Sequence, residues 1–329
     1  SDWLVGINGT RAMTAFNSKT GGFHLTTVGR VQTPTLALIV DREDRIRRFK
    51  PRAFWELEGS FACAAGDYRG KWFDEKFQGK DDDEHARADR LWDEERASLL
   101  QRKCLGQPGS VSEESKASSQ IAPLLYDLTS LQREANSRFG FSAKATLGLA
   151  QALYEKHKIL TYPRTDSRAL PEDYRPTVIS TLTMLAGDAG GRAHAEGLLA
   201  RYAPLAQTIL ERHWVQPNKR IFNNTKVADH FAIIPTLQAP KHLSEPELKL
   251  YDMVVKRFLA VFHPAAEYQI TTRITRVEGQ PFKSEGRVLV NAGWLAVYGR
   301  EAQEGEDGNL VAVAPGEMVR TSDVVIAAH

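Results

Sequence analysis

A short stretch of the chain places chemically useful side chains at every second position. The sequence LTYPRTDSRAL contains Tyr162, Arg164 and Asp166. A residue before proline is disfavoured in the α region, so Tyr162 is expected to be extended. Side chains alternate between the two faces of an extended chain. The phenol, the guanidinium and the carboxylate should therefore share one face.

A phenol beside a guanidinium has a use in phosphoryl chemistry. Phenol has an ordinary pKa near ~10 and is a poor nucleophile at neutral pH unless its charge is stabilised or its proton removed. Arginine favours the phenolate and can grip a phosphate through paired hydrogen bonds. Attack on a phosphodiester would give a phosphotyrosine linkage that retains the bond energy for resealing. A tyrosine before a proline is also typical of a packed aromatic at the end of an element, and spacing alone does not choose between the two.

The composition fits a protein of several domains that lies outside membranes. The chain has 329 residues, with 43 Lys plus Arg against 41 Asp plus Glu, a net charge of +2. No apolar run approaches the ~20 residues of a membrane span. With Cys63 and Cys104 as its cysteines, the chain can form neither a disulfide framework nor a cysteine-rich zinc site. We therefore expect a cytoplasmic protein in a reducing compartment.

The charges are distributed unevenly along the chain. Residues 42–52 (REDRIRRFKPR) are rich in arginine, whereas residues 81–96 (DDDEHARADRLWDEER) are mostly acidic. Clustered acids without a preceding apolar strand indicate a solvated surface better than a metal site.

The first half of the chain reads as helices followed by strands. Residues 1–48 have helical spacing, with Thr33 before Pro34 as a helix-start signature. From Phe54 the pattern alternates and is rich in aromatic residues, which is typical of strands. The polar, serine-rich sequence SVSEESKASSQIAP is interpreted as a connection.

The second half repeats this order. Helical patterns follow Pro123, with Thr129 as a possible N-cap, Gly140 as a stop signal and Ser142 as the next cap. The clearest helix begins with a capping box of Ser244 and Glu247. The sequences YQITTRITRV, GRVLVNAGWLAVYG and GNLVAVAPG then predict strands. The expected class is an α+β multidomain protein in which a helical insertion interrupts a β domain.

The tyrosine stretch closely resembles the active-site motif of the type IA DNA topoisomerases. The sequences LYDLTSLQREANSRFGFSAKATLGLAQALYE, VGRVQTPTLALIVDRE and DHFAIIPT are similar to further segments of that family. Together the matches run from about Asp2 to Gly299. The sequences TYPRTDS and AIIPT resemble the topoisomerase III branch of the family. The chain is therefore identified as a member of the type IA DNA topoisomerases.

The resemblance implies a role for each matching residue. Tyr162 would be the nucleophile that becomes linked to a 5′ phosphate. Arg164 would hold that phosphate, and His230 would contact it or assist proton movement. Contacts with single-stranded DNA are expected from Arg30, Gln32, Gln151, Glu155, Thr165, Asp166 and Ser167. Without the resemblance, His230 would be interpreted as a hydrogen-bonded histidine at a strand end, and Gln151 with Glu155 as a surface pair.

The resemblance also implies a domain division and a cofactor. Residues 1–49 resemble part of a helical base domain, residues 50–122 and 241–329 a β-rich arch, and residues 123–240 the helical domain that carries the tyrosine. In the family, a Toprim domain holds Mg²⁺ with a D-x-D-x-E cluster. These residues contain no such cluster, so we expect a fragment without its own metal site that binds DNA but is inactive alone, from a protein that acts at the nucleoid.

Two other classes of protein would need different features in the sequence. A non-catalytic module that grips single-stranded DNA would need only the tyrosine domain, and the acidic cluster is the feature that separates it from the enzyme. A tyrosine recombinase or relaxase would need arginine and histidine ligands around its tyrosine, or a three-histidine metal site. Neither constellation is visible in the sequence.

Overall fold

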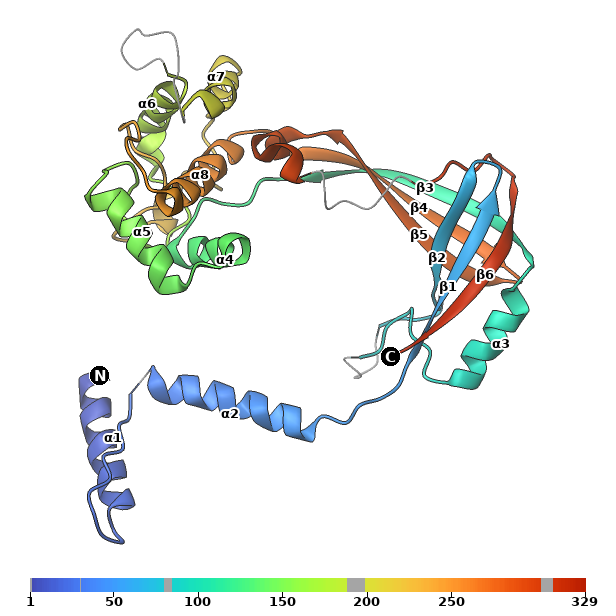
Figure 1. The fold of residues 1–329 in the computed structure, drawn as a ribbon, viewed down its shortest axis with the longest axis horizontal. Helices are drawn as coiled ribbons and strands as arrows, with labels where there is room; N and C mark the ends of the chain where they lie inside the picture. Colours follow the sequence, from blue (N-terminus) through green and yellow to red (C-terminus); the bar gives the residue numbers. More distant parts are fainter. Residues whose placement is uncertain (1, 30, 80–84, 188–198, 303–309) are drawn as a thin grey trace.

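The polypeptide has the shape of an open letter C (Figure 1). The computed structural model describes residues 2–29, 31–79, 85–187, 199–302 and 310–329. A helical unit forms one end of the C, a β-barrel forms the bend, and an arm of two helices forms the other end (Figure 1). None of the described helices is long and apolar enough to cross a membrane.

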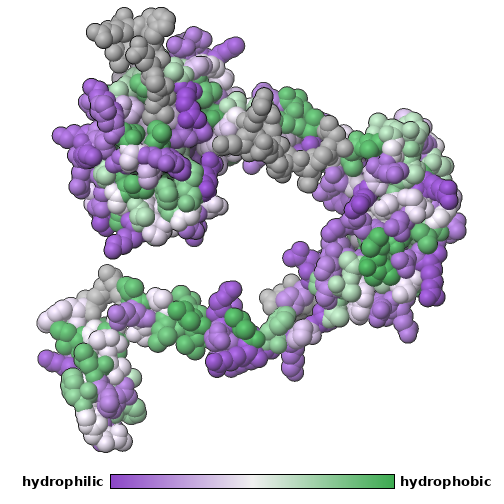
Figure 2. Space-filling view, viewed as in Figure 1, coloured by the Kyte–Doolittle hydropathy of each residue, from purple (hydrophilic) through white to green (hydrophobic). Residues whose placement is uncertain are grey.

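The arm consists of α1 (Asp2–Asn17) and α2 (Gln32–Arg48). Val31 is the N-cap of α2 and makes no side-chain cap hydrogen bond, so the predicted start at Thr33 was late. Pro34 lies inside the first turn, where a missing N–H costs no intrahelical bond. Apolar side chains in the middle of α2 give way to hydrophilic ones towards the barrel (Figure 2), where Arg45, Arg47 and Arg48 form its last turn.

Six antiparallel strands form the barrel, which closes in the order β1-β2-β5-β4-β3-β6. They are β1 (Trp55–Cys63), β2 (Gly66–Trp72), β3 (Pro108–Gln120), β4 (Ala266–Val277), β5 (Gln280–Asn291) and β6 (Met318–Ala328). Helix α3 (Glu94–Cys104) packs on the barrel and contributes Leu100 and Cys104 to a core that also contains Phe61 and Phe282.

Strand β3 is the main correction to the sequence interpretation. The serine-rich sequence expected to be a connection is a strand of 13 residues that pairs with β4 from Gly109↔Val277 to Gln120↔Ala266. Almost all of its side chains are exposed, so the strand lacks the apolar alternation that identifies half-buried strands. Backbone hydrogen bonds to β4 hold it without that pattern.

The sequence GRVLVNAGWLAVYG is also only partly a strand. Strand β5 ends at Asn291, and a 3₁₀ segment, η4 (Gly293–Ala302), follows. At Gly293 φ is 49°, and a Cβ atom there would lie 2.3 Å from the Ala265 carbonyl oxygen, so only glycine fits the turn. The predicted strand GNLVAVAPG is wrong for residues 310–316, which form no strand, and its first residues lie outside the described chain.

The helical unit is inserted between β3 and β4. It contains α4 (Leu128–Phe139), α5 (Ala143–Glu155), α6 (Arg175–Leu185), α7 (Ala203–Glu211) and α8 (Glu245–Ala260), with 3₁₀ turns η1 (Glu172–Tyr174), η2 (Leu199–Arg201) and η3 (Asn224–Lys226). Helix α8 is buried on most sides and supplies Leu250, Val254 and Phe258 to the core of the unit.

Most of the helix caps predicted from the sequence are present in the structure. Gly140 ends α4 with φ 69°, and the Ser142 hydroxyl accepts a hydrogen bond from the Ala145 N–H at 3.1 Å, as predicted. The N-cap of α4 is Asp127, whose carboxylate accepts from the Ser130 N–H at 2.6 Å, so the choice of Thr129 was wrong.

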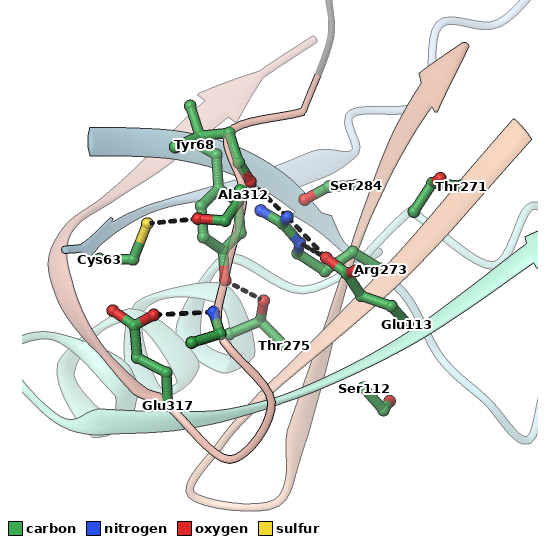
Figure 3. A network of polar contacts seen from close by, with 12 residues as sticks. Cys63, Tyr68, Ser112, Glu113, Thr271, Arg273, Thr275, Ser284, Ala312 and Glu317 are labelled. Atoms are coloured by element: carbon green, nitrogen blue, oxygen red, sulfur yellow. Dashed lines mark hydrogen bonds and ion pairs between the residues drawn. The ribbon is translucent and has the colours of Figure 1, made fainter. Parts of the chain in front are cut away.

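A buried arginine lies inside the barrel (Figure 3). Arg273 is 1% exposed; its Nε donates to Glu113 Oε1 at 2.6 Å and its Nη2 to the Val311 carbonyl at 2.5 Å. The guanidinium lies 4.2 Å from the centroid of the Tyr68 ring, and the Tyr68 hydroxyl is 2.8 Å from Thr275 Oγ1. Its Nη1 has no hydrogen-bond partner within the described residues. The charge of Arg273 therefore depends mainly on Glu113.

We predict that Glu113→Gln destabilises the protein more than Arg273→Met does. Glu113→Gln leaves a buried positive charge uncompensated, and we expect a loss of about 2 kcal/mol, less than the ~3–5 kcal/mol of a fully buried pair because water reaches Glu113. Arg273→Met removes that charge and leaves a carboxylate that water can solvate. Urea unfolding of both variants measures the difference. Glu58→Gln, which breaks an exposed pair with Arg69, is the control and should cost under about 1 kcal/mol. A loss for Arg273→Met that equals or exceeds the loss for Glu113→Gln would contradict the prediction.

Candidate active site and nucleic-acid interface

The tyrosine segment is held by a second extended segment from the same unit. After α5 the chain reverses at Lys158, which has φ 56°. The Thr161 N–H then donates to the Ile234 carbonyl at 3.0 Å, and the Thr236 N–H donates to the Ile159 carbonyl at 3.0 Å. Segments far apart in the sequence thus lie side by side in antiparallel pairing.

Two threonine hydroxyls strengthen this pairing. Thr161 Oγ1 donates to the Ala232 carbonyl at 3.0 Å and accepts from the Ile234 N–H at 2.9 Å. Thr165 Oγ1 donates to the His230 carbonyl at 3.2 Å. Together these bonds fix the backbone of His230 beside the tyrosine segment.

The predicted alternation of side chains is present. Tyr162 is partly exposed, and Arg164 and Asp166 are exposed. Thr165 and Ser167 point inward and are 7% and 5% exposed. The phenol, the guanidinium and the carboxylate therefore share the outward face, as expected for an extended chain.

The phenol lies in an aromatic group. The ring centroids of Tyr162 and His230 are 4.3 Å apart with an interplanar angle of 45°. The Tyr154 ring also contacts the Tyr162 ring edge to face, with 5.4 Å between the ring centroids and an interplanar angle of 77°. Arg164 makes no hydrogen bond or ion pair with another residue in the described part of the chain. The guanidinium is thus available to an external anion.

The remaining predicted DNA contacts fall into separate groups. Gln151 and Glu155 lie on α5, near the tyrosine segment, with Glu155 exposed. Gln32 begins α2, where its Oε1 accepts from Thr27 Oγ1 at 3.2 Å, and Figure 1 shows this helix across the open space from α5. The structure does not bring Gln32 to Tyr162, and Arg30 lies outside the described residues.

The hydroxyls of Thr165 and Ser167 make hydrogen bonds within the protein and do not face solvent. Ser167 Oγ donates to the Lys226 carbonyl at 2.7 Å, and the Ser167 N–H donates to Thr165 Oγ1 at 3.0 Å. Their orientation supports a positioning role more than a direct contact with DNA. Tyr154 and Thr161 were not identified from the sequence. Thr161 could have been identified as a β-branched residue directly before the tyrosine. No local feature of the sequence points to Tyr154.

A histidine and a glutamate tie the exit of α5 to the start of α8. His157 Nε2 donates to Glu247 Oε1 at 3.1 Å, and Glu247 Oε2 accepts from the N–H and the hydroxyl of Ser244 at 2.8 and 2.7 Å. The hydrogen bonds from Ser244, followed by the interaction with His157, lower the pKa of Glu247 to about 2. The capping box predicted at Ser244 and Glu247 is thus also an anchor for the tyrosine segment.

No metal site is formed within the described ranges. They contain no group of three or more His, Cys, Asp or Glu side chains able to hold an ion. The acidic residues 81–84 lie outside these ranges. The residues around Tyr162 therefore do not fit Mg²⁺.

Comparison with known proteins identifies the family of the chain. Residues 1–329 match the DNA topoisomerase family, so the chain belongs to it. It is 40% identical over 326 residues to DNA topoisomerase 3 of Bacillus licheniformis, and 38% identical over 328 residues to DNA topoisomerase 3 of Bacillus subtilis. Each alignment covers 96% of this chain and 40% of the relative, so the chain spans about two fifths of their length.

A solved structure supports the same fold. The full-length topoisomerase I of Thermotoga maritima superposes with a TM-score of 0.62 and 22% identity, covering 99% of this chain and 48% of that protein. The resemblance to type IA topoisomerases and the mixed helical and β class are confirmed, and the names of the relatives agree with the topoisomerase III branch.

We predict that the anchor at Glu247 contributes stability that disappears in acid. A carboxyl whose folded pKa is lowered stabilises the fold above its unfolded pKa, near 4.5, and loses that effect as the pH falls towards about 2. Glu247→Gln should therefore unfold at lower urea concentration than the parent at pH 7, and the gap should narrow between pH 4.5 and 2. Glu245→Gln, two positions earlier, is the control and should show a smaller gap, because its carboxylate pairs with Lys249 on the exposed surface. A gap that stays constant over this range would refute the assignment.

Proposed function

We propose that this chain is the part of a type IA topoisomerase that binds single-stranded DNA and supplies the nucleophile, Tyr162. One observation carries the proposal: the outward-facing Tyr162 lies in ring contact with His230, 4.3 Å between centroids, and two positions from an unpaired Arg164. Membership of the DNA topoisomerase family supports the same reading. The protein would act in the cytoplasm, at the nucleoid.

The proposed reaction is a reversible exchange of esters. The phenolic oxygen of Tyr162 attacks the phosphorus of a phosphodiester and loses its proton. The bond between phosphorus and the 3′ oxygen breaks, the 3′ oxygen takes up a proton, and the 5′ phosphate remains on the tyrosine. The 3′ hydroxyl later attacks the phosphotyrosine and restores the strand. The number of ester bonds does not change, so neither step needs ATP, and another strand can pass through the break.

Arg164 and His230 have complementary roles in this proposal. An exposed guanidinium without an internal partner can bind two phosphate oxygens and stabilise the charge that develops on them. His230 is close enough to the phenol ring to contact the same phosphate or to move a proton. The pairing of Thr165 with the His230 carbonyl keeps this histidine beside the nucleophile.

Magnesium would have its place outside these residues. We propose that a Toprim domain holds the ion, which helps to fix the DNA strand for resealing in the intact enzyme. The described residues offer no set of ligands for it, and none of the steps above involves it. This lack of Mg²⁺ ligands among the described residues favours a second candidate function, a module that binds single-stranded DNA without cutting it.

We predict that the chain binds single-stranded DNA in preference to duplex, with an affinity that falls as salt rises. Basic side chains release counterions when they contact phosphates, and each contact adds about 0.7 to the salt slope for a single strand. Arg164→Gln should reduce that slope by about 0.7 if Arg164 holds a phosphate. Anisotropy titrations of a labelled oligonucleotide at several salt concentrations measure both slopes, with Arg69→Gln on the barrel as the control. Salt-insensitive binding or a preference for duplex would count against the proposal.

We predict that Tyr162→Phe abolishes covalent attachment to DNA but changes strand affinity less than twofold. The substitution removes only the attacking oxygen and keeps the ring contacts with Tyr154 and His230. The chain is incubated with an oligonucleotide, Mg²⁺ and the separately produced Toprim domain of a relative, and adducts that survive denaturation are counted. Tyr174→Phe is the matched control.

The two candidate functions give different results in this assay. Adducts with the parent and the control but not with Tyr162→Phe support the enzyme. Strand binding without any adduct supports the binding module, and adducts with Tyr162→Phe would assign the nucleophile to another residue.

A further inference from the structure

A solvent-open surface cavity of about 450 Å³ lies beside the nucleophile and has no part in the steps above. It is lined by Tyr154, Glu155, Lys158, Leu160 and Thr236. Its wall continues directly into the active site, because the Tyr154 ring meets the Tyr162 ring edge to face at 5.4 Å. Any group attached to Tyr162 therefore starts next to a wall of this cavity.

The walls of the cavity are fixed by the surrounding backbone. Lys158 adopts φ 56°, a left-handed conformation that is uncommon outside glycine. Thr236 Oγ1 donates to the Lys158 carbonyl at 2.7 Å, and the Thr236 N–H donates to the Ile159 carbonyl at 3.0 Å. Residues held in such conformations concentrate at ligand-binding and active sites. The cavity is thus built into the reversal that presents Tyr162.

The lining combines the chemistry that a nucleotide needs. Tyr154 is 38% exposed and offers an aromatic ring, whereas Leu160 is 1% exposed and lies buried behind the lining. The side chains of Glu155 and Lys158 are exposed and form no hydrogen bond or ion pair with any other described residue. A carboxylate can accept a hydrogen bond from the exocyclic amine of a base, and an ammonium can neutralise a phosphate.

We propose that this cavity binds the base of the nucleotide whose 5′ phosphate becomes joined to Tyr162. This inference rests on the proposed function and deepens it. Tyr154 stacks on the base, Glu155 accepts from the amine of cytosine or adenine, and Lys158 pairs with the next phosphate of the strand. Thymine has no exocyclic amine, so the site favours cytosine or adenine over thymine at this position. The pocket therefore contributes to the choice of cleavage site.

The probe is a 5′-phosphorylated single-stranded octamer whose first base is 2-aminopurine, a fluorescent base that stacking quenches. Binding to the chain should quench a first-position probe more than the same base at the sixth position. Tyr154→Leu should remove the extra quenching and weaken binding by roughly tenfold, because stacking on an aromatic side chain supports each base. Tyr154→Phe keeps the ring and should behave like the parent. Leu99→Ala, on α3 of the barrel, is the surface control.

Octamers that differ only in the first base test the role of Glu155. The parent should bind cytosine or adenine roughly tenfold more tightly than thymine, and Glu155→Ala should reduce this ratio towards one. An octamer without a first base should bind Tyr154→Leu and the parent equally. Thermal melting of each variant verifies that it is folded.

Different outcomes separate the failure of the site from the failure of the proposed function. If the chain binds no single-stranded DNA, both fail. If it binds all octamers alike, including one that lacks the first base, the proposed function stands and the base site is overturned. If Tyr154→Leu weakens binding equally with and without a first base, Tyr154 only supports the Tyr162 ring, and the base site is again overturned.

Discussion

The architecture depends on the pairing between β3 and β4. The chain leaves the barrel through β3 and returns through β4, and the helical unit that carries Tyr162 lies between them in sequence. The two strands pair along their whole length, from Gly109↔Val277 to Gln120↔Ala266. An insertion whose entry and exit are paired in this way is fixed at its base by backbone hydrogen bonds, which depend little on side-chain type. The position of the nucleophile relative to the barrel follows from this ladder.

The root of the helical unit is reinforced where the ladder ends. Trp294 Nε1 donates to the Gln120 carbonyl at 2.8 Å, which joins η4 to the last residue of β3. Arg257 of α8, 7% exposed, donates to the Leu124 carbonyl at 3.0 Å and pairs with Glu134 at 2.5 Å. Removing Arg257 would leave the Leu124 carbonyl without this donor, whereas Glu134 would keep its ion pair with Arg138. The Trp294 hydrogen bond thus ties η4 to the end of β3, and the contacts of Arg257 tie α8 to α4 within the helical unit.

Sequence reasoning succeeded where the determinants are local and failed where they are distant. Ser142, Gly140 and Glu247 were assigned correctly because a cap depends on neighbours within one helical turn. Strand β3 was missed because its partner, β4, lies far along the sequence and its own side chains are polar. The face shared by Tyr162 and Arg164 followed from the proline between them. Tyr154 was not found, because its contact with Tyr162 depends on the chain reversal at Lys158.

Charged side chains have partners inside the protein in the structural framework but not in the proposed site. In the framework, Arg273 pairs with Glu113, and His157 pairs with Glu247. At least one side chain of each pair has little contact with solvent. A buried charge requires such a partner, because its desolvation is otherwise uncompensated. Around Tyr162 the charged groups Arg164, Glu155 and Lys158 are exposed and have no partner within the described chain. Water satisfies these groups in the free protein, and an anionic strand with its bases can replace that water without breaking any internal pair.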